Sequence, residues 1–109
     1  KGLRVLHVCG KVGPIIEDMA ECGFDGISIE EPLNIGKIKP IVGDVKILGN
    51  VQSKNLALAT PNAIKEETKK ALEAGVDLLE AGEGILLPTP LNNIKAMVET
   101  VKEWKTSSR

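Results

Sequence analysis

A fourfold alternation of short apolar runs with helical patterns is the feature that most limits the folds open to this chain. The apolar runs cover residues 3–8, 26–30, 45–51 and 77–81. Strands that alternate with helices are typical of βαβ units and a parallel sheet. The last run has no β-branched residue, so we interpret it as a strand mainly from its place in the alternation. The pattern predicts an α/β fold of four strand–helix units, half of the usual (β/α)8 TIM-type barrel.

The first two connections differ in helix strength. We expect the first helix to begin at Pro14, because proline is favoured at the first helical position, and to end before Gly23. Its buried side chains are expected to be Ile15, Ile16, Met19 and Ala20. The second connection, residues 33–43, contains Gly36 and Pro40, which both disfavour a regular helix interior. A short or kinked helix is predicted there.

The third connection carries a complete set of helix signals. Thr60 is expected to cap the helix, Pro61 to open it and Gly75 to close it. Glu66 and Lys70 are spaced to pair across one turn. The side chains expected to face inward are Ile64, Ala71 and Leu72.

The fourth connection and two helix ends show internal repetition. Thr89 and Pro90 repeat the opening of the third helix. The side chains expected to face inward in this fourth helix are Ile94, Met97, Val98, Val101 and Trp104. Residues 21–25 and 73–77 share the pattern acidic, small, glycine, apolar, aspartate before a strand. This weak repeat fits a barrel built from similar units.

Charge and hydropathy restrict the partners and the location that we expect. The chain has 14 Lys and Arg residues against 15 Asp and Glu, so no basic excess attracts nucleic acid or an anionic membrane. No apolar run approaches the roughly 20 residues that span a bilayer, and no signal-peptide pattern is present. We therefore expect a cytoplasmic protein with neither nucleic acid nor membrane as a partner.

The length of 109 residues allows one hydrophobic core, and no Pro-rich or Ser-rich linker divides it. The sequence opens at Lys1 and enters a strand pattern almost at once. We therefore expect residues 1–109 to form a single half-barrel domain that is a fragment of a full barrel.

His7 and Cys9 are the first candidate functional residues, because they lie at the end of the first predicted strand. Residues two apart on a strand point the same way, with Cα atoms about 6.5 Å apart. Zinc binds imidazole nitrogen at about 2.0 Å and thiolate sulfur at about 2.3 Å, so both side chains could reach one ion. The alternative is a buried, hydrogen-bonded histidine beside a cysteine that acts as a small hydrophobic residue.

Three polar residues lie at or just after the ends of other predicted strands, at the same rim, where barrel active sites lie. Glu30 is a candidate third ligand, or else an ordinary solvated acid. Glu83 lies between two glycines, which allow close backbone approach, and is a ligand, an acid/base group or a loop acid. Asn50 could hydrogen-bond a substrate or form a turn. Cys22 has no nearby ligand in the sequence and is interpreted as structural.

Four motifs, taken in order, carry a family resemblance. They are His7-Val8-Cys9-Gly10, then residues 25–31, residues 48–51, and residues 82–85 with Thr89-Pro90 after them. The chain resembles, over essentially its whole length, the C-terminal half of the uroporphyrinogen decarboxylase-like barrels, and among them most closely the methylcobamide:coenzyme M methyltransferases. The resemblance implies a complete eight-unit barrel and a zinc ion. It also implies a methanogenesis-type transfer of a methyl group from a corrinoid on a partner protein to the thiol of coenzyme M.

The resemblance also implies a set of zinc ligands. The methyltransferase motif pairs His-x-Cys with a distant cysteine, and His7 and Cys9 match its first part. Glu83 stands where the distant cysteine is expected, which replaces a soft thiolate by a harder carboxylate that zinc still accepts. The site is also similar to that of cobalamin-independent methionine synthase, in which a glutamate at the position of Glu30 joins the histidine and the cysteine. The implied triad is His7, Cys9 and Glu30, with Glu83 as a further ligand.

Other functions remain open. Uroporphyrinogen decarboxylase itself has a histidine at the position of Glu83 and needs no metal, but this reading gives no task to the combination of Cys9 and Glu30. A half-barrel could instead be non-catalytic and self-associate, because its sheet has exposed edges and apolar faces. Two copies could complete a barrel as a homo-oligomer. A corrinoid-binding module is disfavoured, because no Asp-x-His-x-x-Gly pattern occurs and His7 is the only histidine.

Overall fold

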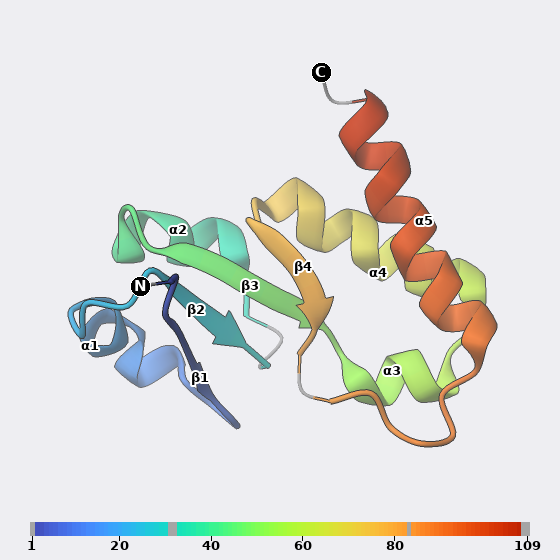
Figure 1. Cartoon of the computed structure of the whole chain (residues 1–109), viewed down its shortest axis with the longest axis horizontal. Helices are drawn as coiled ribbons and strands as arrows, with labels where there is room; N and C mark the ends of the chain where they lie inside the picture. The colour runs from blue at the N-terminus through green and yellow to red at the C-terminus, as the bar shows by residue number, and fades with distance from the viewer. Residues whose placement is uncertain (1, 31–32, 83, 108–109) are drawn as a thin grey trace.

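The four predicted strands form one parallel sheet. In the computed structural model, which describes residues 2–30, 33–82 and 84–107, the strands follow the chain in the spatial order β1-β2-β3-β4 (Figure 1). Their bounds are β1 Val5–Val8, β2 Gly26–Ile29, β3 Lys46–Val51 and β4 Leu78–Ala81. All three neighbouring pairs are parallel. The expected α/β half-barrel sheet is thus confirmed, including the strand that lacks β-branched residues.

Helices occupy every connection. Their bounds are η1 Gly13–Ile15, α1 Ile16–Ala20, α2 Ile35–Val42, α3 Ser53–Leu58, α4 Pro61–Ala74 and α5 Leu91–Ser107. The short second helix was expected, and it contains Pro40. Helix α3, at the rim after β3, was not predicted, because residues 53–58 are too few to show a helical period. Within the described residues, no helix has the length and apolarity needed to cross a membrane.

The start of the first helix differs from the expectation. The residues around Pro14 form the tighter 3₁₀ turn η1, so α1 itself is only five residues long. This turn leaves Ile15 42% exposed, whereas Ile16 and Met19 are buried as expected. Similarly, Val98 on α5 is 43% exposed rather than turned inward.

Helix α4 is bounded as the sequence predicted. The Thr60 hydroxyl accepts a hydrogen bond from the backbone N–H of Ala63 (3.2 Å), and Gly75 ends the helix with a φ of 104°. The expected partner of Glu66 was wrong, because its carboxylate pairs at 3.7 Å with Lys69, one residue nearer than Lys70. Both side chains of that pair are more than half exposed, so it contributes little to stability.

The hydrophobic core lies between one face of the sheet and the helices. The fully buried strand residues Ile27, Ile29 and Ile47 pack in one cluster with residues of α1, α2 and α4. A second cluster joins Val51 to apolar side chains of α3, α4 and α5. Because strand side chains alternate, the remaining strand residues point to the opposite side of the sheet, which we call the inner face.

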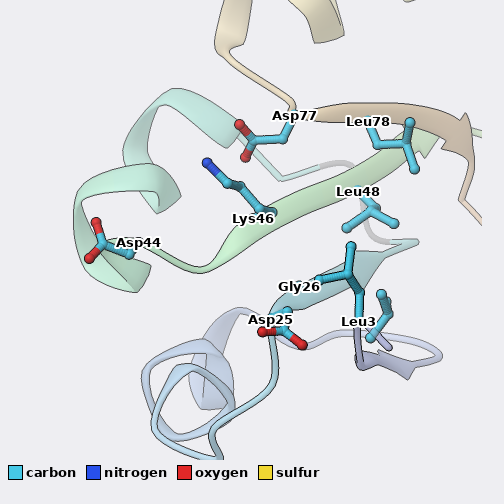
Figure 2. A pocket seen from close by; sticks show the side chains of 9 residues that line it. Leu3, Asp25, Gly26, Asp44, Lys46, Leu48, Asp77 and Leu78 are labelled. Atoms are coloured by element: carbon cyan, nitrogen blue, oxygen red, sulfur yellow. The ribbon is translucent and has the colours of Figure 1, made fainter. Parts of the chain in front are cut away.

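The N-terminal end of the inner face, where the strands begin, is open and carries apolar side chains beside the charged residues Asp25, Asp44, Lys46 and Asp77. It borders a cavity of about 620 Å³, into which Leu48 and Leu78 point (Figure 2). Val5 and Leu78 are 46% and 58% exposed. In a closed barrel such side chains fill the interior in layers. The inner face therefore has the character of a barrel interior without its other half.

The repeated pattern before β2 and β4 has the same structural role in both places. Asp25 accepts a hydrogen bond from the backbone N–H of Arg4 (2.8 Å), and Asp77 accepts one from that of Ile47 (2.9 Å). Each aspartate also donates its own backbone N–H to the carbonyl of the same partner, at 2.9 and 2.8 Å. The glycines of the two repeats have φ values of 87° and 104°, which glycine adopts without strain. Each repeat thus clamps the start of one strand to its neighbour.

Asp77 gives the second clamp a pH dependence. Burial alone would raise the pKa of Asp77, but hydrogen bonds from Lys39 and Ile47 and the charges of Lys39 and Lys46 hold this pKa below its usual value. A carboxylate with a lowered folded-state pKa stabilises the fold above its unfolded-state pKa, near 3.9, and loses this contribution as the pH falls through the folded-state pKa.

We expect Asp77→Asn to lower the free energy of unfolding by about 1 kcal/mol at neutral pH, because the charged hydrogen-bond acceptor is lost. The difference from the wild type should be smaller at about pH 2, because acid shifts Asp77 toward its protonated form, which has no charge for the hydrogen-bond donors to stabilise. Urea denaturation at the two pH values measures this. Asp44→Asn, at an exposed carboxylate beside the same cavity, is the matched control. An equal loss at both pH values would show that the charge of Asp77 does not contribute.

Candidate functional site

His7 and Cys9 come together at the rim of the inner face. The Nε2 atom of His7 lies 3.5 Å from the Sγ atom of Cys9. For a tetrahedral ion with Zn–N and Zn–S bonds of normal length, these two atoms would be about 3.6 Å apart. Both residues are exposed, so Cys9 is not a buried hydrophobic residue. The pair has the donor chemistry and the separation that a shared zinc ion requires.

A hydrogen-bonded chain holds the other side of the His7 ring. Nδ1 of His7 lies 2.9 Å from the hydroxyl of Ser28, its register partner on β2. The Ser28 hydroxyl donates in turn to the carboxylate of Glu80 on β4. Ser28 is only 6% exposed. The series of hydrogen bonds from His7 through Ser28 to Glu80 therefore crosses the inner face from β1 to β4.

Sequence reasoning missed Ser28 and Glu80. The available signal was a polar residue at an inner-face position of an otherwise apolar strand, since Ser28 lies between two core isoleucines and Glu80 interrupts the last run. Neither residue resembles a ligand motif by itself. Only the register of the strands brings them to His7.

Glu30 follows β2, and its side chain contacts the segment that follows β1. Its carboxylate accepts a hydrogen bond from the backbone N–H of Gly10 (3.3 Å), the residue after Cys9. Within residues 2–30, 33–82 and 84–107, however, no three His, Cys, Asp or Glu side chains gather closely enough to hold a metal ion. The structure thus brings two of the three expected ligands together and anchors the third on the adjoining loop.

The ends of β2 and β4 also approach each other at this rim. A Cβ atom on Gly82 would lie 2.9 Å from the Cα atom of Glu30, a contact that only glycine avoids. The inner face is therefore concave here, as in a barrel. Glu83, the expected further ligand, lies outside the described residues.

Asn50 borders a second cavity, and Cys22 makes only a local contact. Asn50 is paired in register with Glu80 and borders a cavity of about 320 Å³, whose other walls come largely from α4 and the segment that leads into α2. Its contact with a substrate stays a prediction. Cys22 follows α1, and its thiol lies 3.3 Å from the carbonyl of Asp18, one helical turn earlier. This local contact fits the structural interpretation of Cys22.

Comparison with known proteins gives a consistent result. Residues 2–104 match the family described as uroporphyrinogen decarboxylase (URO-D). The chain is 47% identical over 105 residues to the methylcobamide:CoM methyltransferase MtaA of Methanosarcina barkeri, an alignment that covers 94% of this chain and 31% of that protein. It is 35% identical over 102 residues to the methylcobamide:CoM methyltransferase MtbA of Methanosarcina acetivorans, covering 93% and 30%.

A solved structure agrees with these relatives. A methyltransferase from Methanosarcina mazei superposes with a TM-score of 0.91 at 44% identity, covering 96% of this chain and 32% of that one. The half-barrel expected from the sequence is therefore confirmed as part of a TIM-barrel-type fold. The chain spans about a third of the length of the relatives that it matches.

Proposed function

Because the chain belongs to the uroporphyrinogen decarboxylase family, we propose that its site serves methyl transfer from a methylated corrinoid to a thiol such as coenzyme M, and not decarboxylation. The carrying observation is the exposed His7–Cys9 pair, with its donor atoms 3.5 Å apart. A decarboxylase without a metal gives this pair no task. The relatives named methylcobamide:CoM methyltransferases support the same choice.

In this proposal His7 and Cys9 bind zinc, and Glu30 and Glu83 supply the remaining protein ligands. The carboxylate of Glu30 already accepts a hydrogen bond from the backbone N–H of Gly10, the residue after Cys9, so it lies beside the proposed site. When bound, zinc would act as a Lewis acid that lowers the pKa of the substrate thiol, so that its thiolate is available near neutral pH.

The residues of the chain then have distinct tasks. His7 offers the lone pair of Nε2, and Cys9 offers its sulfur from an exposed position that a small thiol can approach. Asn50 is proposed to hydrogen-bond the substrate at the end of β3. In the reaction the thiolate sulfur forms the new S–C bond, the electron pair of the Co–C bond stays on cobalt, and the thiol proton is released.

The partners follow from this chemistry. The methyl donor would be a methylcobamide carried by a corrinoid protein, and the acceptor a small thiol. The remaining strands of a complete barrel would cover the open inner face and supply part of the substrate pocket.

A second candidate function is suggested by the exposed apolar side chains at the N-terminal end of the inner face. Leu78 and Val5 are exposed there beside the cavity of about 620 Å³. In the described part of the chain, β1 and β4 are outer strands, with one edge each that no strand covers. We propose that the isolated chain covers these surfaces with a second copy and so forms a homo-oligomer that completes a barrel.

Zinc content tests the enzymatic proposal. The purified chain, reconstituted under reducing conditions, should bind about one zinc ion per molecule by elemental analysis, because its site supplies both nitrogen and sulfur donors. Because the inner face of the half-barrel is open, we expect it to be inactive or incomplete as an enzyme on its own; any demethylation of free methylcobalamin by coenzyme M should be slow and should depend on zinc, as a change of corrinoid absorbance reports. Absence of zinc after reconstitution would refute the proposed metal role. Demethylation that proceeds equally well after chelation would refute the proposed mechanism.

A further inference from the structure

We infer that Ser28 and Glu80 are positioning residues that fix the imidazole of His7 in a single tautomer, with the proton on Nδ1 and a free lone pair on Nε2. We call these three side chains, of His7, Ser28 and Glu80, the relay. Its purpose rests on the proposed metal role of His7. The tautomer itself does not, because it can be measured without any metal.

The assignment follows from counting protons. A serine hydroxyl has one hydrogen to donate, and a carboxylate only accepts. Since the Ser28 hydroxyl donates to the carboxylate of Glu80, its oxygen has only lone pairs left for His7. The contact of 2.9 Å between Nδ1 of His7 and Oγ of Ser28 therefore requires that Nδ1 carries the hydrogen. In a neutral ring, Nε2 must then be the acceptor.

The lone pair of Nε2 points toward Cys9, where a shared metal ion would bind. Nε2 lies 3.5 Å from the sulfur of Cys9, on the exposed side of the ring. In the opposite tautomer an N–H group would occupy this position and exclude a cation from the pair. Metal-binding histidines commonly donate their second ring N–H to a carboxylate or another acceptor, which fixes the ring and its tautomer. Here a serine lies between the imidazole and the carboxylate.

The scaffold holds the relay more firmly than a loop would. All three residues lie on strands, and Ser28 is the register partner of His7. Ser28 is also buried, at 6% exposure, between two fully buried isoleucines of the core. The concave inner face brings β4 toward β2, as the close approach of Gly82 to Glu30 also shows. The geometry of the relay is thus set by the sheet.

Nitrogen NMR of the isotope-labelled protein tests the relay directly. His7 is the only histidine, so every imidazole signal belongs to it. At about pH 8.5, where an ordinary imidazole is neutral, the wild type should show the proton on Nδ1. Ser28→Ala and Glu80→Ala should each give a mixture of tautomers, and Ser28→Thr, which keeps the hydroxyl, should restore the wild-type state.

Matched controls separate the relay from a general effect on the fold. Ser53→Ala changes another buried serine, on α3, and Glu99→Ala changes an exposed glutamate on α5, so neither should alter the tautomer. A wild type with its proton on Nε2 would overturn the inference without any variant. So would an unchanged tautomer in folded Ser28→Ala and Glu80→Ala.

Metal affinity provides a second readout. Zn²⁺ affinity should fall about 10- to 100-fold in Ser28→Ala and in Glu80→Ala, the range expected for loss of an outer hydrogen-bond partner. If the tautomer shifts in the variants while the wild type binds no zinc, the relay stands and the proposed metal role fails. If the wild type binds zinc and its tautomer is unaffected by both variants, the metal role stands and the relay fails.

Discussion

Replacing Cys9 by alanine should weaken Zn²⁺ binding by at least about a hundredfold, the upper end of the range seen when only an outer partner is lost. Thiolate is the softest donor in the described site, and it lies 3.5 Å from Nε2 of His7. Without it, one imidazole nitrogen and carboxylate oxygens would remain, a poorer set for zinc than one that includes thiolate. Competition against a chelating dye under reducing conditions measures the affinity.

Cys22 provides the matched control for this experiment. It is the other free, exposed cysteine, and its thiol contacts the carbonyl of Asp18 away from the rim. Cys22→Ala should therefore leave the affinity for Zn²⁺ unchanged. A similar loss in both variants would indicate binding through solvent-exposed thiols in general. Unchanged binding in Cys9→Ala would exclude the His7–Cys9 pair as the metal site.

The isolated chain is expected to sediment as a dimer or larger oligomer, and Leu78→Lys should weaken this association by roughly a hundredfold, equivalent to about 3 kcal/mol. Leu78 is 58% exposed and borders the large cavity of the inner face. A lysine there would replace apolar contact with a charge that loses its water when the interface closes. Analytical ultracentrifugation over a range of concentrations gives the association constant.

Leu58→Lys is the corresponding control, because Leu58 is 76% exposed at the end of α3 and lies outside the inner face. This variant should associate like the wild type. A wild-type chain that stays monomeric at every concentration would contradict self-association through the inner face. Equal weakening by both substitutions would show that an added lysine reduces association wherever it is placed, and that the inner face is not the specific interface.

The sequence predicted the strands well because their signal is periodic and repeated. Even β4, with poor β propensity, was identified from its place after three similar units. Helix α4 was predicted closely because Thr60 and Gly75 mark its two ends. Helix α3 was missed because six residues are less than two turns, and nothing in so short a segment separates a helix from a loop.

The site could be predicted only in part. His7 and Cys9 are two residues apart, so their proximity follows from the geometry of one strand. Ser28 and Glu80 are 52 residues apart in the chain, and their hydrogen bond depends on the register and the curvature of the whole sheet. Likewise, the pattern that contains Asp25 and Asp77 was visible as a repeat, but its role as a clamp required the backbone partners.

The two clamps have a consequence for how such a barrel can change its chemistry. Asp25 and Asp77 secure strand alignment at the end of the sheet opposite His7 and Cys9. We therefore expect substitutions at the rim to leave the clamp hydrogen bonds in place, so that a ligand there can be exchanged without realigning the strands. In such a scaffold, strand alignment and chemistry depend on residues at opposite ends of the sheet. The reaction can therefore change at one end while the alignment at the other stays the same.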